Sequence, residues 1–124
     1  MTINEAINKV DTLKPNNFNE EDKIGWLSTL DFTVMREMVD THEGGEGIVF
    51  EGYTENTDRD TELLAPAPYD EMYLRWLEAQ IDYANNEFGK YNNAIAMFNT
   101  AYGAYNNYYN RTHMPKGKQR KYFG

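Results

Sequence analysis

The two histidines and the glycine-rich run beside one of them are the first candidates for chemistry in this chain. Residues 42–46, His-Glu-Gly-Gly-Glu, are similar to a zinc-binding helix motif, but Glu stands where the second His ligand belongs. The two glycines also oppose the helix that would bring the ligands together. Glu43 and Glu46 would repel a phosphate group, so a nucleotide site is not expected either. We therefore interpret His42 and His113 as residues at helix C-termini.

A second candidate is the alternating acidic run of Asp58, Asp60 and Glu62, which is spaced like the start of a calcium-binding loop. Leu63 stands where such a loop needs Gly for its sharp turn, so we expect a solvated acidic loop. Ser28 is the only serine, and it lies within a predicted helix and outside any nucleophile motif. The sequence thus predicts no catalytic, cofactor-binding or metal-binding residue, and a protein that is not an enzyme.

An apolar stripe with helical spacing runs through the last third of the chain. Its members are Leu74, Leu77, Ile81, Ala84, Phe88, Tyr91, Ile95, Phe98, Tyr102, Tyr105 and Tyr109. The second half of the stripe is almost entirely aromatic and is surrounded by Asn residues. Because Tyr supplies a large contact area at low entropy cost and keeps a polar tip, we expect this face to dock onto another protein subunit. The predicted subunit and partner interface consists of Phe50, Tyr53, Phe98, Tyr102, Tyr105 and Tyr109.

The helix signals along the sequence predict an all-α fold, a small bundle of about four helices that positions these residues. Thr2 and Glu5 form a capping-box pattern before a helix over residues 3–13, which Pro15 ends. Asn19 begins a second helix that ends near Thr41. Residues 43–67 are expected to form an extended arm, as a loop or a short β-hairpin, that reaches a neighbouring subunit, since so long a connection is usually functional or disordered.

Two long helices are expected within residues 68–112, the first beginning at Pro68. The chain turns at Asn85-Asn86, at Gly89 or at Asn92-Asn93, and the last of these would start a fourth helix over residues 94–112. The Asn pairs favour a helical hairpin, which we prefer, whereas the unbroken stripe favours one long helix.

The chain has 124 residues, a length typical of one domain. Its positive and negative charges are unevenly distributed along the sequence. Residues 1–110 contain all 20 acidic residues and seven Lys and Arg, a net charge of −13, whereas residues 111–124 carry +5. We expect a helical domain over residues 1–113 and a mobile basic tail over residues 114–124. The tail is either a docking segment or a disordered, solubilising end. Its candidate docking residues are Lys116, Lys118, Arg120 and Lys121.

Composition also predicts where the protein works. The absence of Cys fits a reducing compartment, and the first residues do not form a signal peptide, so we expect an intracellular protein with no membrane partner. The aromatic residues lie in an acidic body, whereas phosphate contacts need clustered cations. Direct DNA binding by the folded domain is therefore not expected, although an acidic channel wall past which DNA slides fits the same charges.

Four stretches of the sequence resemble small proteins that tailed phages and prophages encode beside their portal and capsid genes, the head–tail connector (adaptor, head completion) proteins. The stretches are residues 41–43 (Thr-His-Glu), 60–71 (Asp-Thr-Glu-Leu-Leu-Ala-Pro-Ala-Pro-Tyr-Asp-Glu), 91–93 (Tyr-Asn-Asn) and 110–115 (Asn-Arg-Thr-His-Met-Pro).

The resemblance implies a helical virion structural protein that oligomerises as a ring, often a 12-mer, beneath the portal. Such a ring extends the DNA channel and links head to tail. The implied partners are other copies of the chain, the portal protein and a tail or stopper protein, and DNA would pass through the channel without specific binding. The implied locations are the virion and, during assembly, the host cytoplasm. Alternatives are another phage assembly factor, for tail completion or as a scaffold-like chaperone, and an acidic decoy that binds a host protein.

Overall fold

Side-chain caps fix where the first two helices begin. The structure is a computed structural model that describes residues 1–116. Thr2 Oγ1 accepts a hydrogen bond from Glu5 N, and Glu5 Oε1 accepts one from Thr2 N, both at 3.1 Å, at the start of α1 (Ile3–Leu13). Asn19 Oδ1 accepts from Asp22 N at 2.8 Å at the start of α2 (Glu20–Val34). Both predicted helix starts are confirmed.

A single π-helical turn, η1 (Met35–Val39), extends α2 toward the predicted end near Thr41. The chain later forms a helical hairpin of α3 (Glu71–Ala84) and α4 (Phe88–Thr112), so the hairpin interpretation is confirmed. The turn lies at Asn85-Asn86, where Asn86 has a positive φ of 59°. Of the three predicted turn positions, Asn85-Asn86 is therefore the one used. The alternative in which the fourth helix begins at Ala94 is wrong, because α4 begins at Phe88 and includes Gly89 and the Asn92-Asn93 pair.

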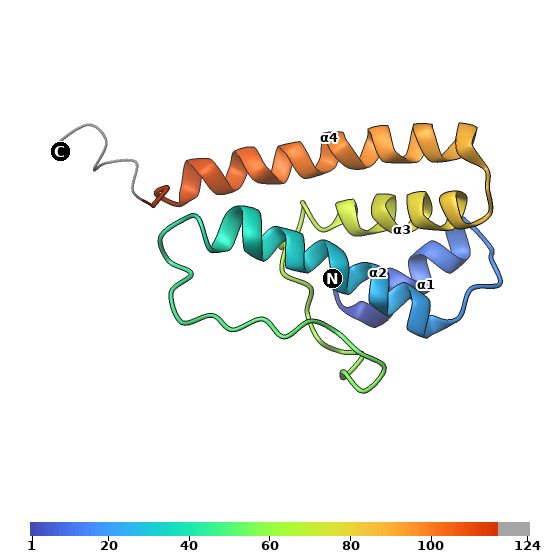
Figure 1. Cartoon of the computed structure of the whole chain (residues 1–124), viewed down its shortest axis with the longest axis horizontal. Coiled ribbons are helices and arrows are strands. Elements are labelled where there is room, and N and C mark those ends of the chain that lie inside the picture. Colours follow the sequence, from blue (N-terminus) through green and yellow to red (C-terminus); the bar gives the residue numbers. More distant parts are fainter. Residues whose placement is uncertain (117–124) are drawn as a thin grey trace.

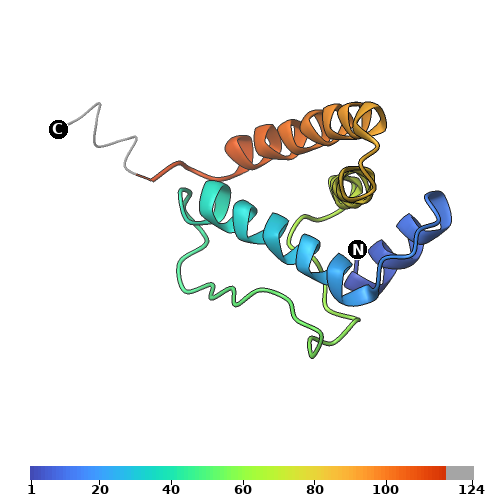
Figure 2. The ribbon, with the colours of Figure 1, turned by 45° about the vertical axis from the view of Figure 1, so that its right-hand side comes forward.

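Helix α3 lies at the centre of the bundle and contacts α1, α2 and α4 (Figure 1). Its fully buried side chains include Met72, Tyr73 and Leu77, which pack in one core with residues of α1 and α2. Figure 2 shows α4 on the side of α3 that faces away from α1. The all-α prediction is confirmed: within residues 1–116, β-pairing is limited to two isolated bridges. None of the helices there is long and apolar enough to cross a membrane.

The connection between η1 and α3 folds back along the same chain, and no β-hairpin forms within it. Ile3 N donates to Thr61 O at 3.1 Å, and Leu63 N donates to Met1 O at 2.9 Å. The prediction of an arm extended toward a neighbour is therefore wrong for residues 59–63, because their backbone groups are satisfied by the start of α1.

Candidate interaction surfaces

A buried carboxylate ties the long connection to the helices. Asp31, on α2, is fully buried and accepts three hydrogen bonds. Tyr53 Oη donates to it at 2.5 Å, Tyr73 Oη at 2.7 Å and Leu64 N at 3.1 Å. Tyr73 Oη in turn accepts from Ala65 N at 2.7 Å. This network joins residues 53–65 to both α2 and α3.

The electrostatics of this network follow from its burial. Desolvation raises the pKa of Asp31, although the hydrogen bonds from Tyr53, Tyr73 and Leu64 oppose that shift by favouring the ionised form. Desolvation and the nearby carboxylate likewise raise the pKa of the Tyr53 and Tyr73 hydroxyls, so both remain protonated donors. Because the carboxylate has no exposed surface, the network can hold the fold but cannot act on a dissolved substrate.

Most of the aromatic rings predicted to meet another subunit lie in this chain's own core. Those that are buried are Tyr53, Phe98, Tyr105 and Tyr109. Tyr105 packs with Tyr69 of the connection, with ring centroids 5.8 Å apart, and Phe98 packs with Trp76 of α3 at 5.0 Å. The interface prediction is corrected for these four rings, because residues of α2, of α3 and of the connection between η1 and α3 contact them.

The other two predicted interface residues, Phe50 and Tyr102, are half-buried. Tyr102 Oη donates to Glu37 Oε1 at 2.5 Å, which joins α4 to η1. Phe50 packs edge-on against Phe32, with centroids 4.9 Å apart. Their remaining exposed surface leaves a contact with a partner as a prediction.

The end of α4 is joined to the segment that follows η1. His42 is buried, with Nδ1 2.7 Å from Met38 O and Nε2 2.7 Å from Asn110 Oδ1. Its ring also meets Tyr109 edge-on at 5.1 Å. His42 therefore fills a structural position at a helix end, as its sequence context predicts. His113 stacks on Tyr109 at 3.9 Å, also at the end of a helix.

The basic tail starts as a paired segment. Glu43 N donates to Met114 O at 2.7 Å, and Lys116 N donates to Thr41 O at 2.8 Å. Lys116 Nζ lies 3.9 Å from Glu46 Oε1. The tail was predicted to be mobile from residue 114, and the structure instead places its first three residues beside residues 41–43. The other candidate docking residues, Lys118, Arg120 and Lys121, lie outside the described residues.

Two groups of large apolar side chains remain at the surface, and of their members only Phe88 and Tyr91 belong to the predicted apolar stripe. The first, here named the loop patch, consists of Phe32, Ile48 and Val49, which are 46%, 51% and 80% exposed. Together with Met35, Arg36, Asp40 and Phe50 these residues line a groove. The second, named the hairpin-end patch, consists of the exposed Tyr83 and Phe88 and the half-buried Tyr91 around the α3–α4 turn. The ring centroid of Tyr83 lies 5.8 Å from that of Phe88 and 5.3 Å from that of Tyr91.

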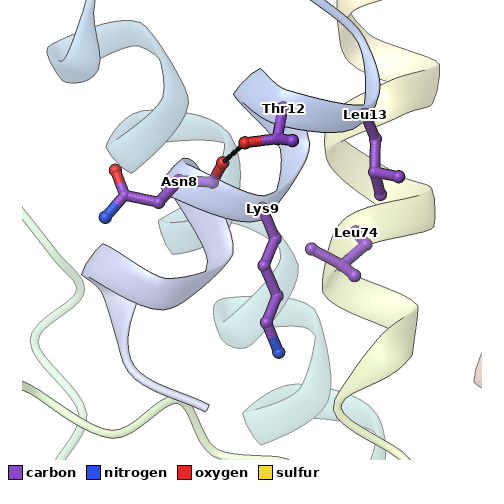
Figure 3. A pocket seen from close by; sticks show the side chains of 5 residues that line it. All are labelled: Asn8, Lys9, Thr12, Leu13 and Leu74. Atoms are coloured by element: carbon purple, nitrogen blue, oxygen red, sulfur yellow. Dashed lines mark hydrogen bonds between the residues drawn. The ribbon is translucent and has the colours of Figure 1, made fainter.

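The two patches lie toward opposite ends of the bundle. The α3–α4 turn is at one end of the long axis, whereas the chain that leaves η1 runs around the other end (Figure 1). Figure 3 shows a further shallow hollow between α1 and α3, where Leu13 and Leu74 form the apolar wall beside Lys9. Leu13, which is 62% exposed, also borders the hollow at the α3–α4 turn. Most other residues around that second hollow are polar or charged, among them the ion pair of Lys14 and Asp82.

The described residues do not assemble a recognisable reaction centre. Within residues 1–116, no three His, Asp or Glu side chains are grouped so that they could hold a metal ion. Ser28, the one serine, accepts a hydrogen bond from Tyr53 N at 2.9 Å and so helps to fix the connection. Comparison with known proteins found no match to any family model, curated protein or solved structure.

Proposed function

We propose that this chain is a non-enzymatic structural subunit that associates head to tail with copies of itself, as a head–tail connector of a tailed phage or prophage. The observation that carries the proposal is the pair of unlike apolar patches toward opposite ends of the bundle. A head-to-tail contact needs two different surfaces on each subunit, and repeated contacts of this kind close into a ring when the rotation between subunits allows it.

The chemistry of the patches supports protein partners. Exposed aromatic and aliphatic side chains gathered in a patch mark protein contacts more often than scattered ones do. The loop patch supplies Ile48 and Val49 on a segment that also carries Glu43 and Glu46, so its rim is polar. In the proposed ring, the loop patch of one subunit meets the hairpin-end patch of the next.

The resemblance of residues 41–43, 60–71, 91–93 and 110–115 to connector proteins supports the choice of this class among structural subunits. On this proposal the ring, often twelvefold in such proteins, lies beneath the portal, binds a tail or stopper protein and lets DNA pass. The net charge of −8 suits a channel wall that does not retain DNA.

The test combines the chain with the portal protein of the virus or prophage that encodes it. Electron microscopy and co-sedimentation should show rings of the chain on the portal. Val49→Asp should abolish the rings, because a carboxylate would enter the centre of the subunit contact. Met97→Asp is the matched control: Met97 is 49% exposed on α4 and belongs to neither patch. Failure of the unmodified chain to bind portal, or rings unaffected by Val49→Asp, would contradict the proposal.

A further inference from the structure

The groove beside the loop patch is open, and its exposed floor is apolar. Phe32 of α2 and Ile48 and Val49 of the connection form that floor, and Arg36 and Asp40 stand at its polar side. Burying such side chains stabilises a contact in proportion to the apolar area removed from water. The groove is therefore suited to receive apolar side chains from another segment.

The chain itself passes close to this groove just before the described residues end. Lys116 N bonds to Thr41 O, and Thr41 directly follows Asp40, which lines the groove. Eight residues follow Lys116 in the sequence. At about 3.3–3.6 Å per extended residue they reach at most about 26–29 Å, a distance that allows them to return across a groove that begins next to their anchor.

Charge also favours contact between the groove and the eight residues after Lys116. Residues 36–51 carry five acidic side chains and one Arg, whereas residues 117–124 carry three basic side chains and no acidic one. The acidic residues are Glu37, Asp40, Glu43, Glu46 and Glu51. Lys116 already lies within reach of Glu46. The segment also ends in the aromatic pair Tyr122-Phe123, which matches the apolar floor.

We propose that residues 117–124 dock into this groove of their own chain, with Tyr122 and Phe123 against Phe32, Ile48 and Val49. The basic side chains then face the acidic rim. A short tether raises the effective concentration of the segment to the millimolar range, so that a weak contact suffices to fill the groove. The contact does not depend on the proposed function. Its consequence does rest on that function: the segment and a neighbouring subunit would compete for the loop patch.

The experiment uses the full chain and exploits its lack of Cys, since Gly124→Cys then gives a unique site for a nitroxide spin label. Methyl NMR reads the side chains of Ile48 and Val49, and the exposed Leu13 and Met97 serve as internal controls. We expect the label to remove most of the Ile48 and Val49 signal and to leave the controls. Adding Tyr122→Ser and Phe123→Ser should restore the lost signal, while the unlabelled spectrum shows that the fold is kept.

Three outcomes would overturn the proposal. They are no broadening at Ile48 and Val49, equal broadening at the control methyl groups, and broadening that persists when both aromatic rings are removed. Mixing isotope-labelled chains without the nitroxide and spin-labelled chains without isotopes separates docking within one chain from docking between two. If the mixture shows the same broadening as the chain that carries both labels, the tail of a second copy occupies the groove and the proposal is wrong. These NMR measurements use the isolated chain, so their outcome does not depend on whether the chain binds portal.

Discussion

The hydroxyl of Tyr53 offers the sharpest test of how the long connection is held, and Tyr53→Phe removes it alone. The ring is buried and packs edge-on against Phe50 with centroids 5.1 Å apart, so the phenylalanine keeps the packing. What is lost is the hydrogen bond to Asp31 at 2.5 Å. Hydrogen bonds to charged groups contribute about 1.5–3 kcal/mol, so the variant should lose about that much of its free energy of unfolding near pH 7.

The loss of stability caused by Tyr53→Phe should depend on pH in a definite direction. Burial raises the pKa of Asp31 above its unfolded value, so its contribution to stability is fully present below the unfolded pKa and is lost as pH rises through the folded pKa. The hydroxyl of Tyr53 limits that loss, because it stabilises the ionised carboxylate. Tyr53→Phe should therefore be destabilised more at pH 7 than at pH 4, where Asp31 is protonated to a greater extent.

Urea denaturation followed by far-UV circular dichroism, at a series of pH values between these two, measures both effects. Tyr83→Phe is the matched control: Tyr83 is 58% exposed, so removing its hydroxyl should change stability by less than about 0.5 kcal/mol at any pH. Equal destabilisation of Tyr53→Phe at both ends of the series, or a loss no greater than that of the control, would refute the assigned role of Asp31.

Four further substitutions test separate parts of the structure. Gly52→Ala should destabilise by more than about 1 kcal/mol in thermal or urea denaturation, because Gly52 has φ +83° and an added Cβ would lie 2.7 Å from the Phe32 ring. Tyr105→Ala should lower the free energy of unfolding by about 3–5 kcal/mol, since Tyr105 is only 3% exposed. An unchanged melting temperature would instead indicate that this ring belongs to an interface. Val49→Asp should change stability by about 0.5 kcal/mol or less and reduce association, as sedimentation velocity would show. Thr2→Ala should cost about 1 kcal/mol through the lost cap, and a loss near zero in urea denaturation would contradict that.

Local signals in the sequence were sufficient to predict where the first two helices begin and that the last two form a hairpin. The Thr2–Glu5 capping box and the Asn19 cap act within one turn, so their residue types fix both helix starts. The choice between hairpin and long helix was also decided locally, because Asn tolerates the positive φ that the turn needs at Asn86. The alternative turns at Gly89 and at Asn92-Asn93 are not used, because α4 includes these residues despite their low helix propensity and is held by α3 and, farther along, by Tyr69 and His42.

The candidate interface could not be predicted in the same way, because burial of the Tyr-rich stripe depends on segments distant in sequence. Tyr69 and His42 cover Tyr105 and Tyr109, and nothing in the spacing of the stripe identifies these neighbours. One signal was available: Asp31 falls on the apolar face of α2 between Leu27 and Val34, and a carboxylate there needs buried donors. Such a donor set implies that a remote segment folds back onto α2.

Head-to-tail association through two different patches is the central claim, and mixing two interface variants tests it most directly. Val49→Asp spoils the loop patch and Phe88→Asp spoils the hairpin-end patch, and both are made in chains that also carry Tyr122→Ser and Phe123→Ser. In sedimentation velocity each variant alone should remain monomeric, whereas their mixture should form dimers and nothing larger, because only one intact contact can form. A mixture that stays monomeric while the parent chain forms larger species, or either variant associating by itself, would contradict the claim.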